Sequence, residues 1–443
     1  MSGGQASGAP PGDTRGDGAE VLDIPDAEAH GVFRPMPRTG VIYVMTEAAK
    51  RGFHYGHPDW ANLGQGAPET GPIAGSPERI HHIEVDPSAN EYGPVQGLAD
   101  VREAVAELYN ARYRVGMASK FTARNVALSA GGRLALTRIA ATLGSINLGH
   151  FLPDYTAYEE LLDLFRAFVP LPILLDGERG FDLPPDHLRR EIVGKGLSAL
   201  LISNPCNPTG HVIRGGALRA WVDICRQTGC VLIVDEFYAH YLYGGTARQD
   251  GPSHSAMRYV DDVNRDPVVI VDGLTKNWRY PGWRLAWTVG PEWIIERITS
   301  AGSFIDGGPP HPVQRAALPL ITREHADAEA RAIQGVFDDK RRLVMERLRG
   351  MGIGLDAEPQ GAFYCFANLE NLPGPLRDGM TFFRKALEKQ VVVVPGQFFD
   401  VNPGKRRDHI PSRLRRYVRV SFGPSRDQVE LGLDRLDALI RES

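Results

Sequence analysis

Cysteine is scarce in this sequence. Only Cys206, Cys225, Cys230 and Cys365, among 443 residues, carry a thiol. The one close pair, in CRQTGC, has no second pair to complete a zinc site, so we expect no metal site. Free thiols in such small number are typical of a protein from a reduced compartment.

Long apolar runs are also missing. No uninterrupted run is long enough to span a bilayer, and the opening stretch MSGGQASGAPPGDTRGDGAE lacks the apolar segment of a signal peptide. We therefore expect a cytoplasmic protein without membrane contact.

Net charge is small as well. Lys and Arg number 50 against 54 Asp and Glu, which gives a formal charge of -4. The chain as a whole then has no attraction for phosphate backbones or anionic membranes, and any anion site must be local. We expect no nucleic acid partner. A dinucleotide-dependent redox enzyme is not expected either, because no G-x-G-x-x-G follows an apolar strand pattern.

What is present is a globular composition with changes of texture along the chain. Hydrophobic residues make up 42% and charged residues 23%, enough to build the cores of about two domains. Four regions are predicted: a disordered tail (1–28), an N-terminal arm that is part of a small domain (29–65), a large domain (66–310) and the rest of the small domain (311–443).

The large region reads as α/β. Its continuous apolar runs are typical of strands buried on both faces of a mostly parallel sheet, with helices packed outside. The runs are Ser198–Ser203, Val231–Asp235 and Pro267–Asp272, and Ala217–Gly229 between two of them has helical spacing and ends in Gly. From about Pro312 a long charged helix, short apolar strands and a final amphipathic helix predict a smaller α+β domain.

Suggestive residues stand where the apolar runs end. In an open parallel sheet, ligands bind beyond the carboxyl ends of the strands. The turn NPCNPTG (Asn204–Gly210), the acid Asp235 and the amine Lys276 each follow one run. Each has a plain alternative: a tight Asx-turn loop, a helix N-cap and a surface lysine.

A fourth feature is the Gly-Gly pair before a predicted helix at Arg133. Gly131 and Gly132 let a backbone approach a ligand closely, and the helix start points free N–H groups at an anion. An ordinary helix cap is the alternative. Together the four features supply a phosphate cradle, a carboxylate, hydrogen-bond donors and an amine, and Arg284 adds a second cation.

This set is what pyridoxal phosphate requires, and it resembles the fold type I aminotransferases of class I/II. The resemblance runs from about Asn62 to the C-terminus in the order and at the spacings of the family. The corresponding segments are NLGQGAPE, EYGPVQGLADVREA, AGGRLAL, PDYTAY, NPCNPTG, DEFY, LTKNWRYPGWRLAW, PQGAFY and RYVRVSFG. It implies pyridoxal 5'-phosphate as the cofactor.

The resemblance also implies a role for each matched residue around the cofactor ring. Lys276 would form the internal aldimine and then shuttle the substrate proton, Asp235 would pair with the pyridine nitrogen, and Asn207 and Tyr238 would donate to the ring oxygen O3′. Tyr155 would stack on the ring face. Tyr158, three residues on, is expected to be core.

Further matches concern the phosphate and the substrate. Arg284 and the backbone N–H groups of Gly132 and Arg133 would hold the phosphate, and Tyr92 would reach the phosphate of a neighbouring subunit, which implies a homodimer with shared sites. Arg419, with Gly66 and Asn207 beside it, would bind the substrate α-carboxylate. The alternative for Arg419 is a solvated or nucleic-acid-binding face, since it ends the basic run KRRDHIPSRLRRYVR; its alternation with Val418 and Val420 favours the buried interpretation.

Two positions depart from the family pattern. Gly273 stands three residues before the lysine, where a serine or threonine of the phosphate cup is usual, and Thr275 is the candidate to replace it. Arg133 stands where a small or hydroxyl residue is usual, so it could add a cation to the phosphate or project toward the substrate. Side-chain selectivity remains open, with Trp60, Arg133, Trp278 and His240 as candidates.

The resemblance leaves three functions to compare. The leading one is transamination between an L-amino acid and a 2-oxo acid. An alternative with nearly the same motifs is side-chain elimination or replacement, as in aminocyclopropane carboxylate synthase. A ligand-sensing transcription regulator is the third, but the N-terminal tail is too short and polar for a helix-turn-helix.

Overall fold

The computed structural model describes residues 40–245 and 251–443. These residues belong to one compact unit. The predicted tail, 1–28, and the first part of the predicted arm lie outside the described residues. The predicted boundaries at 65/66 and 310/311 stay predictions.

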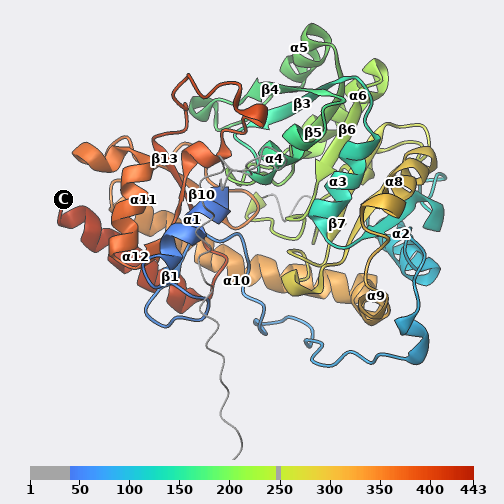
Figure 1. Cartoon of the computed structure of the whole chain (residues 1–443), viewed down its shortest axis with the longest axis horizontal. Helices are drawn as coiled ribbons and strands as arrows, with labels where there is room; N and C mark the ends of the chain where they lie inside the picture. The colour runs from blue at the N-terminus through green and yellow to red at the C-terminus, as the bar shows by residue number, and fades with distance from the viewer. Residues whose placement is uncertain (1–39, 246–250) are drawn as a thin grey trace, which may run out of the picture. The chain divides into compact units, whose positions relative to one another are not determined.

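A seven-stranded sheet forms the larger part of the molecule (Figure 1). Its spatial order is β2-β8-β7-β6-β5-β3-β4; β8 is antiparallel to β2 and β7, and the other pairs are parallel. The strands are β2 (Val126–Ser129), β3 (Asn147–Leu152), β4 (Val169–Leu174), β5 (Leu197–Ser203), β6 (Val231–Asp235), β7 (Val268–Gly273) and β8 (Ala286–Val289).

Helices cover both faces of this sheet because successive strand residues point to opposite sides. In β6, Leu232 and Val234 enter one apolar cluster, with α2, α5 and α6, whereas Ile233 enters another, with α3, α4 and α8. The helices are α2 (Ala99–Tyr113), α3 (Gly132–Thr142), α4 (Ala157–Leu164), α5 (Pro185–Lys195), α6 (Gly215–Thr228), α8 (Glu292–Ile305) and α9 (His311–Ala317).

A smaller α+β region combines both ends of the described chain. Figure 1 shows α1 and β1 beside β10, β13, α11 and α12, and β1 pairs in parallel with β11. The strands β12, β13, β10 and β9 form an antiparallel sheet in that order. The elements are α1 (Gly40–Ala49), β1 (Ala61–Asn62), α10 (Arg323–Gly350), β9 (Gly354–Leu355), β10 (Tyr364–Asn368), α11 (Gly379–Glu388), β11 (Val391–Val392), β12 (Val394–Pro395), β13 (Tyr417–Ser421) and α12 (Arg426–Arg441).

The predicted fold class is therefore confirmed, and several elements lie within a residue or two of their predicted bounds. The predicted helix Ala217–Gly229 is α6, which Gly229 ends in the left-handed conformation with φ of 70°. All four cysteines are buried and free. No described helix is long and apolar enough to cross a membrane, and the described residues contain no cluster of metal-ligating side chains.

Candidate active site

The carboxyl ends of β5, β6 and β7 bring the predicted site residues to one edge of the sheet. β7 leads into the loop of Lys276, whose amine donates a hydrogen bond to the carbonyl oxygen of Gly66. The Tyr241 hydroxyl donates to the backbone carbonyl of Lys276 at 3.0 Å, and this hydrogen bond holds the loop in place. Lys276 is half-buried and is thus no surface lysine.

The surroundings of Lys276 favour a neutral amine. Desolvation by burial is the main cause that lowers its pKa to about 7, and the positive charges of Arg419, Arg284 and Arg133 lower it further, while Asp235 opposes them. At neutral pH about half of the amines with this pKa are neutral and can accept a proton.

Asp235 ends β6 as a buried carboxyl group with neutral donors. The Tyr158 hydroxyl donates to Oδ2 at 3.1 Å and the Phe237 N–H to Oδ1 at 3.3 Å. Burial raises the pKa of Asp235 to about 6, although both donors and Lys276 pull it down. A cation placed against this carboxylate would stabilise its charged form.

Arg419 is buried on β13 and its charge is met only by neutral acceptors. Nη1 donates to Asn207 Oδ1 at 2.9 Å and Nη2 to the Gly64 carbonyl at 2.5 Å. Nε has no hydrogen-bond partner among residues 40–245 and 251–443. Because Asn207 uses its oxygen for Arg419, its amide nitrogen remains a donor. A planar carboxylate fits beside this guanidinium.

Two tyrosine hydroxyls complete the floor of the site. Tyr238 Oη lies 2.8 Å from Tyr364 Oη, and the guanidinium of Arg419 lies over the Tyr364 ring at 4.3 Å. A Cβ on Gly66 would lie 2.6 Å from Tyr364 Oη, so only glycine fits there. If Tyr364 donates to Tyr238, the Tyr238 proton is free for another acceptor.

The segment that we predict to bind a phosphate is the N-terminus of α3. Gly131 has φ of 94°, and a Cβ there would lie 2.0 Å from Nη2 of Arg284. Gly132 is required too, because a Cβ would lie 2.3 Å from the Phe237 ring. Arg133, exposed, donates to Tyr155 Oη at 3.3 Å. Free helix N–H groups and the Arg284 guanidinium thus lie together at Gly131, an arrangement that suits a phosphate dianion.

The departure at Gly273 has a packing reason. A Cβ at this position would lie 2.5 Å from the Cα of Ala286 and 2.6 Å from the carbonyl oxygen of Leu285. The backbone of β8 approaches β7 too closely for any side chain, so a serine does not fit here. Thr275 lies half-buried beside Lys276.

Some candidates lie elsewhere. Tyr92 is 100% exposed, so a single chain does not bring it to Lys276. Trp60 and Trp278 are core residues. His240 is buried, with Nδ1 2.7 Å from the carbonyl oxygen of Asn277 and Nε2 3.0 Å from Nη1 of Arg112, so it holds structure as a neutral ring. Burial is the main cause that lowers its pKa well below the usual value.

Sequence reasoning missed other parts of the site. Tyr158 is core as expected, yet its hydroxyl is a donor to Asp235. Tyr364 lies in the matched segment PQGAFY, which was the available signal for it. Asp154 is fully buried and bonded to the Ser203 hydroxyl, and that hydroxyl accepts the Asn207 N–H at 3.2 Å. No local pattern indicates this link between the ends of β3 and β5.

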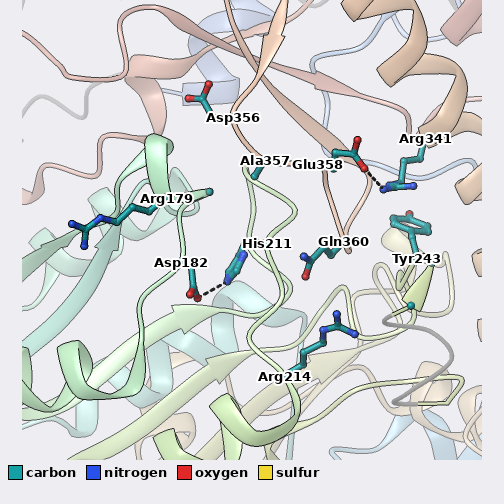
Figure 2. A pocket seen from close by; sticks show the side chains of 13 residues that line it. Arg179, Asp182, His211, Arg214, Tyr243, Arg341, Asp356, Ala357, Glu358 and Gln360 are labelled. Atoms are coloured by element: carbon teal, nitrogen blue, oxygen red, sulfur yellow. Dashed lines mark ion pairs between the residues drawn. The ribbon is translucent and has the colours of Figure 1, made fainter.

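A separate cavity of about 600 Å³ is lined by residues that include His211, Arg341 and Glu358. Figure 2 shows two pairs of ionisable side chains along it: His211 Nε2 lies 3.2 Å from Asp182 Oδ1, and Arg341 Nη2 lies 3.5 Å from Glu358 Oε2. Its described lining includes none of the residues assigned above.

The donors at the sheet edge fit pyridoxal phosphate. The buried Asp235 suits a protonated pyridine nitrogen, the cradle of Gly131, Gly132 and Arg284 suits a phosphate, and the amine of Lys276 suits an aldehyde. Arg419 remains available for a substrate carboxylate.

The chain is similar to known proteins over most of its length. The family model described as aminotransferase class I and II matches residues 58–436. The aspartate aminotransferase of Pyrococcus abyssi is 27% identical over 402 residues, covering 87% of this chain and 93% of the relative. Aromatic-amino-acid aminotransferase 2 of Thermococcus litoralis is 26% identical over 401 residues, with 86% and 92% covered.

A solved structure supports the fold. The aspartate aminotransferase of Thermus thermophilus with maleate superposes with a TM-score of 0.73 at 23% identity, covering 92% of this chain and 100% of that one. The named relatives are aminotransferases, which favours transamination over side-chain elimination or replacement.

Proposed function

The chain belongs to the aminotransferase class I and II family, which makes it a pyridoxal-phosphate-dependent transaminase, and from this premise we propose which of its residues carry the reaction. The reaction moves an amino group between an amino acid and a 2-oxo acid. One observation carries the assignment: the Lys276 amine donates to the Gly66 carbonyl, and the buried Arg419 donates to the Gly64 carbonyl two residues away and to Asn207. An amine suited to the aldehyde and a guanidinium suited to the α-carboxylate are thus held by neighbouring carbonyl groups.

Lys276 is the group that moves the substrate proton. Pyridoxal phosphate, when bound, supplies an aldehyde for the amino group and a ring that accepts electrons from the substrate Cα. With a pKa of about 7, the Lys276 amine can take the proton from the substrate Cα and would return it to the carbon that was the cofactor aldehyde, on the far side of the transferred nitrogen. The ionised Asp235 would keep a proton on the pyridine nitrogen.

The other residues bind and orient. Tyr238 and the Asn207 amide nitrogen would donate to the ring oxygen, and the Tyr155 ring would stack on the cofactor. The backbone N–H groups of Gly132 and Arg133 and the charge of Arg284 would hold the phosphate.

The α-carboxylate of the substrate is the ligand we assign to Arg419. Its two neutral acceptors and its unpartnered Nε support this role. Gly66 and Asn207 flank the same position, and a Cβ on Gly66 would lie 3.8 Å from Nη1 of Arg419.

For the substrate class, we propose a dicarboxylic amino acid. Arg284 suffices for the phosphate and Arg419 for the α-carboxylate, so the exposed guanidinium of Arg133 is a surplus cation at the mouth of the site. The Pyrococcus relative is named for aspartate. Arg133→Gln should lower kcat/KM for L-aspartate about tenfold or more while sparing L-phenylalanine. Equal loss for both substrates would refute this selectivity.

The active form we propose is a homodimer with shared sites. The fully exposed Tyr92, together with the exposed Ile83 and Val85 on the same segment, supports contact with a second copy. Light scattering after size exclusion should give twice the mass of one chain. A monomer that retains full activity would exclude the shared site.

We also propose a cytoplasmic location. The four buried, free thiols are consistent with a reduced compartment. Cell fractionation with thiol trapping checks it.

The test of the function is a spectrum with an assay. The wild-type protein with pyridoxal phosphate should show a visible band that Lys276→Ala lacks, and an amino acid should convert the band while a 2-oxo acid restores it. Conversion without restoration, with release of a side-chain fragment, would instead support elimination. A wild-type spectrum equal to that of free cofactor would refute the role of Lys276.

A further inference from the structure

Arg279, three residues after Lys276, has an unusual backbone. Its φ is 56°, in the left-handed region that L side chains rarely adopt. The residue closes the turn of the Lys276 loop, with its N–H donating to the Lys276 carbonyl at 3.0 Å. Glycine is the residue that adopts this conformation without strain. The presence of arginine here therefore indicates that its side chain has a function that glycine cannot supply.

The guanidinium of Arg279 is fully buried and reaches two other parts of the chain. Nε donates to Glu329 Oε1 on α10 at 2.7 Å. Nη1 donates to the backbone carbonyls of Gly71 at 2.6 Å and Glu69 at 3.1 Å. One side chain thus joins the Lys276 loop to the segment 64–71.

Arg79 makes the reciprocal connection. Its guanidinium donates to the carbonyls of Trp278 at 3.0 Å and Arg279 at 2.8 Å, lies 3.5 Å from Glu329 and stacks 3.6 Å from the Tyr280 ring centroid. The two arginines therefore tie the N-terminal segment and the Lys276 loop together from both sides. We call Arg79, Arg279 and Glu329 the arginine clamp.

The clamped segment carries groups of the active site. The Gly66 carbonyl accepts from Lys276, and the Gly64 carbonyl accepts from Arg419 at 2.5 Å. The distance between the reacting amine and the carboxylate-binding arginine thus depends on how segment 64–71 is held.

The arginine clamp is a poor device for stability alone. Two buried guanidinium groups share one carboxylate, and Arg279 Nη2 and Glu329 Oε2 have no hydrogen-bond partner within the described part of the chain. Apolar side chains fill such space at lower cost than buried ions do. Strained backbone and buried charge persist together where a site requires a fixed geometry.

We propose that Arg279 is a positioning residue for transamination: its guanidinium, held by Glu329, fixes segment 64–71 against the Lys276 loop and so sets where the substrate α-carboxylate lies relative to the amine. This rests on the proposed roles of Lys276 and Arg419. Arg279 touches neither cofactor nor substrate and acts through the two carbonyls it holds.

Glycine is the informative substitution. Arg279→Gly keeps the left-handed backbone without strain but removes the connection, whereas Arg279→Lys keeps a cation without the fork. We expect Arg279→Gly to raise the KM for the amino acid about tenfold to a hundredfold, with a smaller effect on kcat. The KM of Arg279→Lys should lie between that of Arg279→Gly and that of the wild type.

Arg138→Lys is the matched control. Arg138, in the second half of α3, is also fully buried and ion-paired to Asp306, and its other hydrogen bonds go to the carbonyls of Leu128 and Val95, neither of which is assigned to the site above. It should lower the melting temperature and leave KM unchanged. If Arg138→Lys and Arg279→Lys raise KM equally, the effect is general destabilisation and the proposal fails.

Hydrogen exchange of the cofactor-free protein gives a readout independent of turnover. Peptides that cover residues 61–72 should exchange faster in Arg279→Gly than in wild type, while those from α3 keep their rate. Unchanged exchange and unchanged KM would overturn the proposal. A wild-type protein without transaminase activity would refute the proposed function, and the exchange experiment would still decide whether Arg279 holds the segment.

Discussion

Removing the Tyr158 hydroxyl tests the least expected contact of the site. Tyr158→Phe keeps the ring against Tyr155 and deletes one donor to the buried Asp235 carboxylate. A hydrogen bond to a charged group contributes about 1.5–3 kcal/mol, so the affinity for pyridoxal phosphate should fall about tenfold to a hundredfold. The Tyr158 side chain is fully buried in an apolar cluster, and the phenylalanine keeps this packing.

The pH dependence of the affinity for pyridoxal phosphate should also change in Tyr158→Phe. The ionised form of Asp235 binds the protonated ring, and its pKa is raised to about 6 by burial against the lowering effect of Phe237 and Tyr158. Loss of the Tyr158 donor raises that pKa further, so on acidification the variant should lose cofactor affinity at a higher pH than wild type does.

The assay is titration of the cofactor-free protein with pyridoxal phosphate, followed by absorbance between pH 5 and pH 8. Tyr155→Phe is the control, since it loses only the hydroxyl that accepts from Arg133 at 3.3 Å. Affinity of Tyr158→Phe within twofold of wild type at every pH would refute the reasoning.

Three further changes have definite outcomes. Arg419→Lys should lower kcat/KM about a hundredfold through loss of the bidentate fork, with cofactor affinity retained; an unchanged KM for the amino acid would contradict this. Gly273→Ser should lower the free energy of unfolding by about 1–3 kcal/mol, because its Cβ would lie 2.5 Å from the Cα of Ala286, and a wild-type melting temperature would refute the close approach. Burial raises the pKa of Asp154 to about 8, so between about pH 4 and about pH 8 the native protein binds a proton that the unfolded chain has released. The free energy of unfolding should therefore fall as the pH rises from about 4 to about 8. In urea unfolding of the cofactor-free protein, Asp154→Asn should reduce this slope by up to about 1.4 kcal/mol per pH unit, and an unchanged slope would contradict it.

The strand ends were predictable because each one has a local signal. A continuous apolar run predicts a buried strand, and the acid, amine or turn that follows it identifies both where the strand ends and which polar group stands there. The run Val231–Asp235 coincides with β6, and the run Ser198–Ser203 lies within β5, one residue shorter.

Contacts between distant residues left no such signal. Tyr158 and Asp235 are 77 positions apart and meet because β3 and β6 flank β5. The reason for Gly273 depends on how closely β8 approaches β7. His240, a selectivity candidate by its place after DEFY, is a buried support of Asn277 instead, since partners from α2 and the Lys276 loop saturate both ring nitrogens.

The long helix α10 fixes the spacing between two side chains that hold the N-terminal segment. Glu329, in the arginine clamp, and Lys340, which binds the side chain of Glu69 and the carbonyl of Pro424 at 2.7 Å each, are both on it. The eleven residues from 329 to 340 make about three turns and about 16 Å, so both side chains leave one face of the helix. A one-residue insertion between them would rotate one partner away by about 100°. Among natural variants of this chain, the exposed side chains between residues 329 and 340 should therefore vary freely, whereas insertions and deletions there should be rare.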